Sequence, residues 1–332
     1  MRKEWMARVV LSLGLTFAVA IPAVGWWQHT QAIVLHARMA ENGGWTPEKL
    51  TIAVGEPLRL RLTSDDVLHG FAVGQLSQPA VDVKPGEMTE VTLVLDKPGK
   101  YTFYCTRWCS VNHWRMRGTI EVTDSQTKTD PVKPPLYIAL GLDIDANHQT
   151  RITPAQMPSA WHGALLNRSV SEAYKNREYY LSHTPVDLWL ALRSQPDLKD
   201  LNSQDIWDLV AWVWQSNTTP EEVRQGKELF SDNCAACHGE SGTGNGVFAN
   251  QLVTNLSEVG PDQSMGQQAR SPANFTDASQ MLSASPAHLQ GKIIRGGMGT
   301  GMPYWGPIFT EDQTWALIAY LWTFQFQLEV IP

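Results

Sequence analysis

The four cysteines of this 332-residue chain lie in two close pairs, Cys105 with Cys109 and Cys234 with Cys237. Neither pair is spread like a disulfide framework, and each has histidine and methionine residues nearby. Two small local disulfides in an exported protein are the alternative interpretation. The spacing and the neighbouring residues favour two sites that hold a metal or a cofactor.

The first pair lies in the segment CTRWCSVNHWRM, which also contains His113 and Met116. Thiolate, imidazole and thioether groups together suit copper, because soft sulfurs favour Cu(I) and imidazole supports both oxidation states. His69 can supply a second imidazole if the fold brings its loop beside the cysteines. A mononuclear site would use one cysteine, whereas two thiolates four residues apart allow both sulfurs to bridge two coppers. Zinc is the alternative metal, but zinc sites seldom use methionine.

The second pair lies in the sequence CAACH, which is the C-x-x-C-H pattern of covalent haem attachment. In this pattern Cys234 and Cys237 bind the haem vinyl groups, and His238 is the proximal iron ligand. The sixth ligand is expected downstream, where GGMGTGMPYWG offers Met298 and Met302. A methionine there leaves no open position on the iron, so the sequence predicts an electron relay and not a catalyst.

The elements that must position the first site have strand character. Residues 31–124 contain short β-branched runs such as 50–54 and 91–95, separated by turn signals such as Pro98-Gly99. This pattern predicts a β-sandwich. Residues 125–135 are polar and proline-rich, and they predict a linker.

The elements beyond the linker are predicted to be helices. Capped starts precede apolar residues at helical spacing, at Thr184, Asn202, Thr219 and Thr310. We divide this region into a helical segment, 136–217, and a haem-bearing domain, 218–332. The first segment has no C-x-x-C-H pattern, and its histidines, His148, His162 and His183, are predicted to be surface or core residues.

Two of the predicted helices resemble each other. LNSQDIWDLVAWVWQ and FTEDQTWALIAYLWT share four residues at a constant offset, and the pairs are Trp207/Trp315, Leu209/Leu317, Ala211/Ala319 and Trp214/Trp322. These matches indicate either a weak internal repeat or the patterning common to amphipathic helices. Residues 136–217 are therefore either a cytochrome c-like segment without haem or a plain helical spacer.

The N-terminus predicts a membrane anchor over residues 1–30. An uncharged run, 9–27, follows Arg2, Lys3 and Arg8, and at about 1.5 Å per residue it spans roughly 28 Å, enough to cross a bilayer. The preceding basic residues place the later domains outside the cytoplasm. The alternative is a signal peptide cleaved near residues 18–20.

Length and charge set the remaining bounds. A chain of this length predicts two or three domains. The net charge of -7 and the pI near 5.7 argue against a nucleic-acid partner and are compatible with a basic protein partner.

The segments TSDDVLHGF, VKPGEMTEVTLVLDKPGKYTFYC and CTRWCSVNHWRMRGTIEV resemble the CuA domain of cytochrome c oxidase subunit II, over residues 69–122. The resemblance is to the branch with a single transmembrane helix. It implies a Greek-key cupredoxin sandwich and a dinuclear copper (CuA) centre. The implied ligands are the side chains of His69, Cys105, Cys109, His113 and Met116, with the backbone carbonyl of Arg107. The family often has Glu at position 107, so any contact of a Glu side chain with a catalytic subunit is in doubt.

Residues 219–326 are similar to class I cytochromes c, on the CAACH motif, SPANFTD and the final helix. This resemblance implies one covalently bound haem c. It also favours Met302 over Met298 as the axial ligand, because Met302 precedes a proline in a Gly-rich loop just before the terminal helix.

Together the two resemblances imply a multidomain electron-transfer subunit of a haem-copper terminal oxidase. Electrons would pass from haem c through CuA to a catalytic subunit I that reduces oxygen, and this chain alone would have no turnover. A cytochrome c or a cupredoxin would be the electron donor. The implied location is the cytoplasmic membrane of a prokaryote, with the soluble domains on the periplasmic or extracellular side.

Three alternatives stay open at this point. One is the CuA-bearing small subunit of a nitric oxide reductase, and another is a released periplasmic electron shuttle or copper-delivery protein. A redox sensor is less favoured because the sequence contains no signalling domain. Nitrous oxide reductase is not favoured either, because its catalytic copper cluster needs many histidines and this chain has 9.

Overall fold

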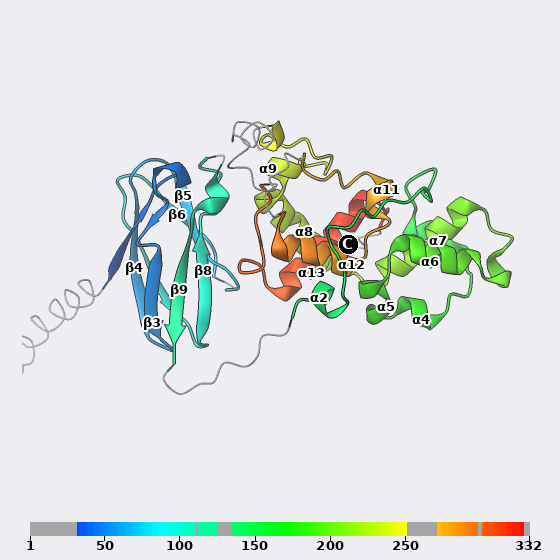
Figure 1. Ribbon diagram of the computed structural model, residues 1–332, viewed down its shortest axis with the longest axis horizontal. Helices are drawn as coiled ribbons and strands as arrows, with labels where there is room; N and C mark the ends of the chain where they lie inside the picture. The colour runs from blue at the N-terminus through cyan, green and yellow to red at the C-terminus, as the bar shows by residue number, and fades with distance from the viewer. Residues whose placement is uncertain are drawn as a thin grey trace, which may run out of the picture. The chain divides into compact units, whose positions relative to one another are not determined.

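The computed structural model describes residues 32–76, 78–110, 112–124, 134–250, 271–297 and 301–328. The predicted anchor, most of the predicted linker and Met298 lie outside these ranges. None of the helices within the described ranges is both long and apolar enough to cross a bilayer. The chain divides into two compact units, a β unit and a helical unit (Figure 1).

The β unit is a sandwich of two sheets, as the strand pattern predicts. One sheet has the order β2-β1-β4-β7 and the other has the order β3-β9-β8-β5-β6. The strands are β1 (Ile33–Ala37), β2 (Trp45–Thr46), β3 (Lys49–Ala53), β4 (Pro57–Ser64), β5 (His69–Val73), β6 (Val81–Val83), β7 (Thr89–Val94), β8 (Gly99–Tyr104) and β9 (Arg117–Thr123). Two 3-10 turns, η1 (Ala40–Asn42) and η2 (His113–Arg115), lie between strands.

The core of the sandwich follows from the two-residue period of its strands. In β4 every second residue is buried, and Leu58, Leu60 and Leu62 are at most 3% exposed. The rings of Trp45, Phe71 and Phe103 form an aromatic cluster with centroids 5.7–5.9 Å apart. The side chains between the sheets therefore support the strand ends from which the ligand loops start.

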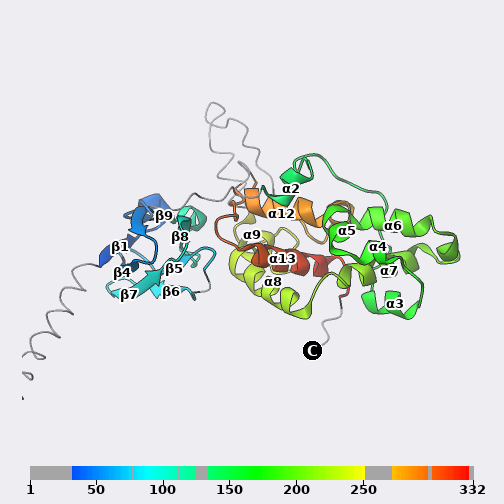
Figure 2. The same cartoon turned by 90° about the horizontal axis from the view of Figure 1, so that it is seen from below.

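The helical unit contains two crossed helix pairs, α3 with α7 and α8 with α13, and several shorter helices. The pair α8 and α13 lies side by side in both views (Figures 1 and 2). The helices are α2 (Leu136–Ala139), α3 (Ala160–Leu165), α4 (Glu172–Lys175), α5 (Arg177–Ser182), α6 (Pro185–Arg193), α7 (Ser203–Gln215), α8 (Pro220–Asn233), α9 (Ala235–His238), α11 (Ala278–Met281), α12 (Pro286–Arg295) and α13 (Glu311–Leu321). The 3-10 turns are η3 (Pro196–Leu198) and η4 (Trp322–Phe324).

The four predicted helix starts are helix N-caps in the structure. Thr184, Asn202, Thr219 and Thr310 each form a complete capping box at the start of α6, α7, α8 and α13. Each box satisfies backbone N–H groups that the first turn of a helix leaves without partners. The local sequence therefore determines where these helices begin.

Candidate metal and haem centres

The candidate copper ligands come from three places in the β unit that pairing brings together. His69 is the first residue of β5, Cys105 directly follows β8, and Met116 directly precedes β9. Strand β8 pairs with β5 on one side and with β9 on the other, so the three strand ends lie next to one another. The sequence had suggested that His69 lies in a loop, whereas in the structure it is the first residue of strand β5.

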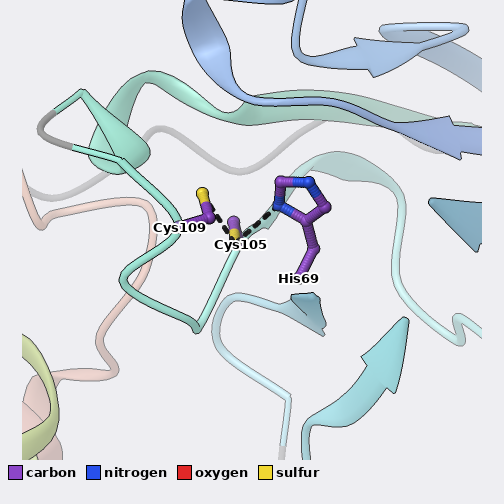
Figure 3. Close-up of side chains that lie close together, drawn as sticks. All are labelled: His69, Cys105 and Cys109. Carbon is purple, nitrogen blue, oxygen red and sulfur yellow. Dashed lines mark hydrogen bonds between the residues drawn. The ribbon is translucent and has the colours of Figure 1, made fainter. Parts of the chain in front are cut away.

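The distances between the donor atoms are short (Figure 3). The Sγ atoms of Cys105 and Cys109 are 3.8 Å apart, and Nδ1 of His69 lies 3.7 Å from Sγ of Cys105. Sδ of Met116 lies 3.4 Å from Sγ of Cys109. Both cysteines are free, because a disulfide would hold the sulfurs about 2.05 Å apart. The disulfide alternative is therefore wrong for this pair.

The second imidazole, that of His113, lies in the turn η2 between the cysteines and Met116. The residue is 5% exposed, and neither ring nitrogen finds a hydrogen-bond partner with acceptable geometry. The ring nevertheless lies close enough to Cys105 to lower the pKa of that thiol. A buried imidazole without partners is costly unless something else satisfies it, and a metal ion would do so.

The environment of His69 fixes which nitrogen faces the sulfurs. Nε2 of His69 lies 2.7 Å from Oδ1 of Asp66, which leaves Nδ1 toward Cys105. Burial lowers the pKa of His69, but its hydrogen bonds to Cys105 and Asp66 outweigh burial and raise the pKa overall. Burial also raises the pKa of Asp66, yet hydrogen bonds from His69 and from the amides of Met39 and Val67 bring it to about 2. A carboxylate behind a histidine is the arrangement that orients metal-ligating imidazoles.

The two thiols of the candidate copper site shift each other's pKa in opposite directions. The hydrogen bond with Cys109 is the largest influence on Cys105 and lowers its pKa well below the ordinary value for a thiol, with His113 and His69 acting in the same direction. The same bond raises the pKa of Cys109, and burial adds to this increase. The buried sulfurs, imidazoles and thioether fit copper better than a hard cation.

The candidate haem site is built around α9, a separate short helix that follows α8. The helix with the capped start at Thr219, α8, ends at Asn233 and the chain turns at Cys234, so the CAACH motif is not part of that helix. The two cysteines are free thiols, and burial raises their pKa values, to about 12 for Cys234 and about 11 for Cys237. The two thiols form no disulfide, and thioether formation requires free thiols.

The orientation of His238 suits an iron ligand. Its Nδ1 lies 3.1 Å from the carbonyl oxygen of Ala273, so Nδ1–H donates and Nε2 is left as the ligand atom. Its ring stacks on Phe275 at 4.7 Å, and Phe275 stacks on Phe324 at 6.1 Å. Burial lowers the pKa of His238, which keeps the ring in the neutral form that binds metals.

The loop after the motif needs glycine because it folds back tightly over α9. The amides of Gly244 and Gly246 donate to the carbonyls of His238 and Cys237. A Cβ on Gly246 would lie 2.4 Å from the carbonyl oxygen of Ala236, which excludes a side chain. The free thiols, the oriented imidazole and this tight loop together fit a covalently attached haem.

Met302 lies in the loop between α12 and α13, and its carbonyl accepts a hydrogen bond from the amide of Gly297. The backbone of Pro303 passes Gly296 so closely that a Cβ there would lie 2.6 Å from the Pro303 carbonyl oxygen. The loop is thus folded back on the end of α12. The other candidate, Met298, lies outside the described residues.

Two family profiles match the chain, one over each kind of site. Residues 38–123 match "Cytochrome C oxidase subunit II, periplasmic domain", and residues 223–325 match "Cytochrome c". The chain joins an oxidase subunit II periplasmic domain to a cytochrome c domain. This result agrees with both resemblances seen in the sequence.

Two curated relatives named as oxidase subunit 2 match about a quarter of the chain. Cytochrome c oxidase subunit 2 of Thermus thermophilus is 35% identical over 81 residues, which is 24% of this chain and 59% of the relative. Subunit 2 of Apis mellifera ligustica is 36% identical over 81 residues, which is 24% of this chain and 36% of the relative. The chain therefore spans about half the length of the curated relatives that it matches, or less.

Among solved structures, the periplasmic domain of subunit II of cytochrome oxidase from Bradyrhizobium japonicum aligns with a TM-score of 0.25 and 19% identity. The alignment covers 29% of this chain and 85% of that chain.

Three contacts in the subunit II domain were not found from the sequence. Besides Asp66 behind His69, Asp82 accepts two hydrogen bonds from the guanidinium of Arg107, at 2.9 and 2.7 Å. Nε1 of Trp45 donates to the carbonyl of Met116 at 3.2 Å. The pairs Asp82 with Arg107 and Trp45 with Met116 are far apart in sequence, so spacing gave no signal for them, whereas Asp66 lies only three residues before His69.

The carbonyl and the side chain of Arg107 point to different partners. Its oxygen is 3.2 Å from Sγ of Cys105, toward the donor atoms, while its side chain points to Asp82 on β6. The Arg side chain therefore has a partner within the domain. The unusual residue at this position is compatible with a backbone carbonyl ligand.

Proposed function

We propose that this chain is the electron-transfer subunit II of a haem-copper terminal oxidase, with a dinuclear CuA centre and one covalent haem c. When bound, these groups each carry single electrons, and electrons would pass from the haem through CuA to a catalytic subunit I that reduces oxygen. The subunit II and cytochrome c domains in one chain support this proposal. The single observation that carries it is the pair of free sulfurs 3.8 Å apart, with His69 and Met116 beside them.

The chain's own residues supply the ligation and its surroundings. For copper we assign His69, Cys105, Cys109, His113 and Met116, with the carbonyl of Arg107. For haem we assign Cys234 and Cys237 as attachment residues and His238 and Met302 as axial ligands. Asp66 holds the imidazole of His69 in the tautomer that directs Nδ1 to the sulfurs.

The surroundings of the copper donors favour fast transfer over substrate chemistry. Cys105, His69 and Met116 are at most 2% exposed, so water has little access to the copper donors. Buried, fixed ligands reorganise little when the charge changes, and they leave no position for a substrate. We therefore assign turnover to a partner subunit, and we expect the donor to be a cytochrome c or a cupredoxin.

We also propose that residues 1–30 anchor the chain in a prokaryotic cytoplasmic membrane, with the soluble domains on the outer side. Tethering raises the effective concentration of both domains near a membrane partner. Mass spectrometry of the mature N-terminus tests the anchor. Loss of the residues before about position 28 would contradict it and would favour a released shuttle.

The function is tested by purifying the chain from native membranes and identifying what co-purifies. We expect a haem-copper subunit I, oxygen consumption with a reduced donor, and two coppers per haem iron. A complex that reduces nitric oxide but not oxygen would overturn the terminal-oxidase assignment. Fewer than two coppers per iron after full copper loading would overturn the CuA assignment.

A further inference from the structure

The two crossed helix pairs of the helical unit meet at equivalent glycines. A Cβ on Gly163 in α3 would lie 2.0 Å from the backbone oxygen of Asp208 in α7. A Cβ on Gly226 in α8 would lie 2.0 Å from the backbone oxygen of Ala316 in α13. Asp208 and Ala316 each directly follow one of the aligned tryptophans of the sequence repeat. The two pairs therefore cross at the same point of the repeat, which shared helical patterning does not require.

The elements between the crossed helices follow the same order. Helix α4 begins nine residues after Gly163, and α9 begins nine residues after Gly226, and both are 4 residues long. Helices α6 and α12 both begin with a proline after a hydroxyl N-cap, Thr184 or Ser285. When Gly163 is aligned with Gly226, the positions of Cys234, Cys237 and His238 are occupied in the first repeat by Ser171, Tyr174 and Lys175.

The first repeat, residues 159–217, has other side chains at the positions where the second repeat has Cys234, Cys237 and His238. Lys175, at the position of the proximal histidine, pairs with Glu172 at 2.9 Å and lies 4.6 Å from the ring centroid of Trp212. The connection from α4 to α7, residues 176–202, contains no glycine and is less than half as long as residues 239–310 in the second repeat. Tyr180 from this connection is 2% exposed and packs on Trp214. Side chains thus occupy the interior of this repeat.

The two repeats contact each other through equivalent residues. Trp214 and Trp322 occupy the same position of the two repeats, and their rings meet edge to face with centroids 6.0 Å apart. Contact between equivalent residues is what a two-fold arrangement of two similar folds produces. Trp214 also lies 6.4 Å from Phe326, and the amide of Ala160 donates to the carbonyl of Gln327.

A short chain of contacts leads from this interface to the haem ligand. The turn η4 carries Trp322, which faces Trp214, and also Phe324. Phe324 stacks on Phe275, and Phe275 stacks on the ring of His238. The interface therefore fixes the turn that supports the aromatic wall beside the proximal histidine.

We propose that residues 159–217 are a second cytochrome c fold that has no haem site and serves as the fixed partner of the haem-bearing repeat. In this arrangement Trp214 is a positioning residue, which acts on His238 through η4 and Phe275. The proposal rests on the haem site of the proposed function. The haem content of the unaltered full-length chain, one per chain, tests that site separately.

The absence of a haem site is tested in the full-length chain carrying Cys234→Ser and Cys237→Ser together. Pyridine haemochrome assay and intact mass should show the loss of all haem from this variant. Lys175→Ala in the otherwise unaltered chain should leave the haem spectrum unchanged. Haem retained after the double cysteine change, or a spectrum altered by Lys175→Ala, would overturn the proposal.

The positioning role is tested with Trp214→Leu and Trp214→Phe. Trp214→Leu should shift the reduction midpoint and the low-spin EPR signal of the haem, and Trp214→Phe should restore most of both. The control is Trp189→Leu, because Trp189 contacts Trp207 and Ser203 within its own repeat. Trp189→Leu should lower stability but leave both haem readouts in place.

If Trp214→Leu does not fold, Phe326→Leu replaces it, because Phe326 is the other aromatic partner of Trp214 across the interface. The expected shift of midpoint and EPR signal is the same. Haem readouts in either variant that match those of Trp189→Leu would overturn the positioning role.

Discussion

The copper and haem sites differ in how their ligands reach one another. Four of the copper donors lie in the connection between β8 and β9, namely Cys105, Cys109, His113 and Met116, and His69 joins them only because β5 pairs with β8. At the haem site, both thiols and the proximal imidazole lie within five consecutive residues, 234–238. The first site is thus assembled by the sandwich, whereas the second is largely built by a single turn of chain and needs the fold for its axial methionine and its aromatic wall.

This difference predicts different failures when a cysteine is lost. Cys109→Ser should abolish the dinuclear copper site, because a single thiolate cannot provide two bridging sulfurs, and the haem should be unaffected. Copper EPR and the copper-to-iron ratio measure the change. Cys237→Ser is the matched control and should disturb haem attachment while copper stays at two per chain. An unchanged copper spectrum in Cys109→Ser would contradict the dinuclear assignment.

The axial methionine is the part of the haem site that depends on the fold. Met302→Ala should leave the haem attached and lower its reduction potential by on the order of 100 mV, since axial ligation sets haem potentials over about 0.8 V. Optical redox titration measures the change. Met298→Ala is the control and should leave the potential in place. The reverse pattern would move the axial role to Met298.

Acid should weaken the helical unit through His288. Burial and the nearby His148 and Lys292 lower the pKa of His288 to about 4. The carboxylates of Asp145 and Asp143 act in the opposite direction but do not outweigh them. A histidine in the unfolded chain has a pKa near 6.5. The contribution of neutral His288 to the free energy of unfolding is therefore complete above about pH 6.5 and is lost as the pH falls to about 4. The shift corresponds to at most about 3 kcal/mol. His288→Phe should therefore reduce the loss of thermal stability between about pH 6.5 and pH 4. Thermal unfolding is measured by haem absorbance.

His162 provides a control with the opposite sign. Its hydrogen bond to Asp208 raises its pKa, so its contribution is complete below about pH 6.5 and is lost as pH rises through the raised value. The side chain is half exposed, so the effect is small. His162→Gln should leave the acid limb unchanged. A wild-type acid limb in His288→Phe would contradict the assignment to His288.

The smallest expected effect concerns the ion pair between Asp82 and Arg107, a residue of the loop that carries the two copper-site cysteines. Asp82→Asn removes the charged partner of Arg107, an exposed pair worth about 0–1 kcal/mol. Because the Arg107 carbonyl faces Cys105, we expect a small shift of the copper potential with little change in stability. Glu87→Gln, which breaks the exposed pair with Lys84, is the matched control and should not move the potential.

Much of the candidate site could be predicted from the sequence, because its strongest patterns are local. The motif CAACH, the cluster CTRWCSVNHWRM and the four capping boxes each lie within about a dozen residues, so their chemistry is legible without a fold. The contacts of Asp82 with Arg107 and of Trp45 with Met116 were not predictable in this way. Their partners depend on which strands pair and in what register, which spacing along the chain does not encode.

The internal repeat shows the same division. The sequence by itself shows four matching residue pairs in two helices and the absence of a C-x-x-C-H pattern from residues 136–217. Only the tertiary structure decided that Gly163 and Gly226 occupy equivalent helix crossings and that Trp214 meets its own counterpart, Trp322. The physical reason is that a close helix approach is a contact between distant residues, and a glycine in sequence does not say which backbone it must admit.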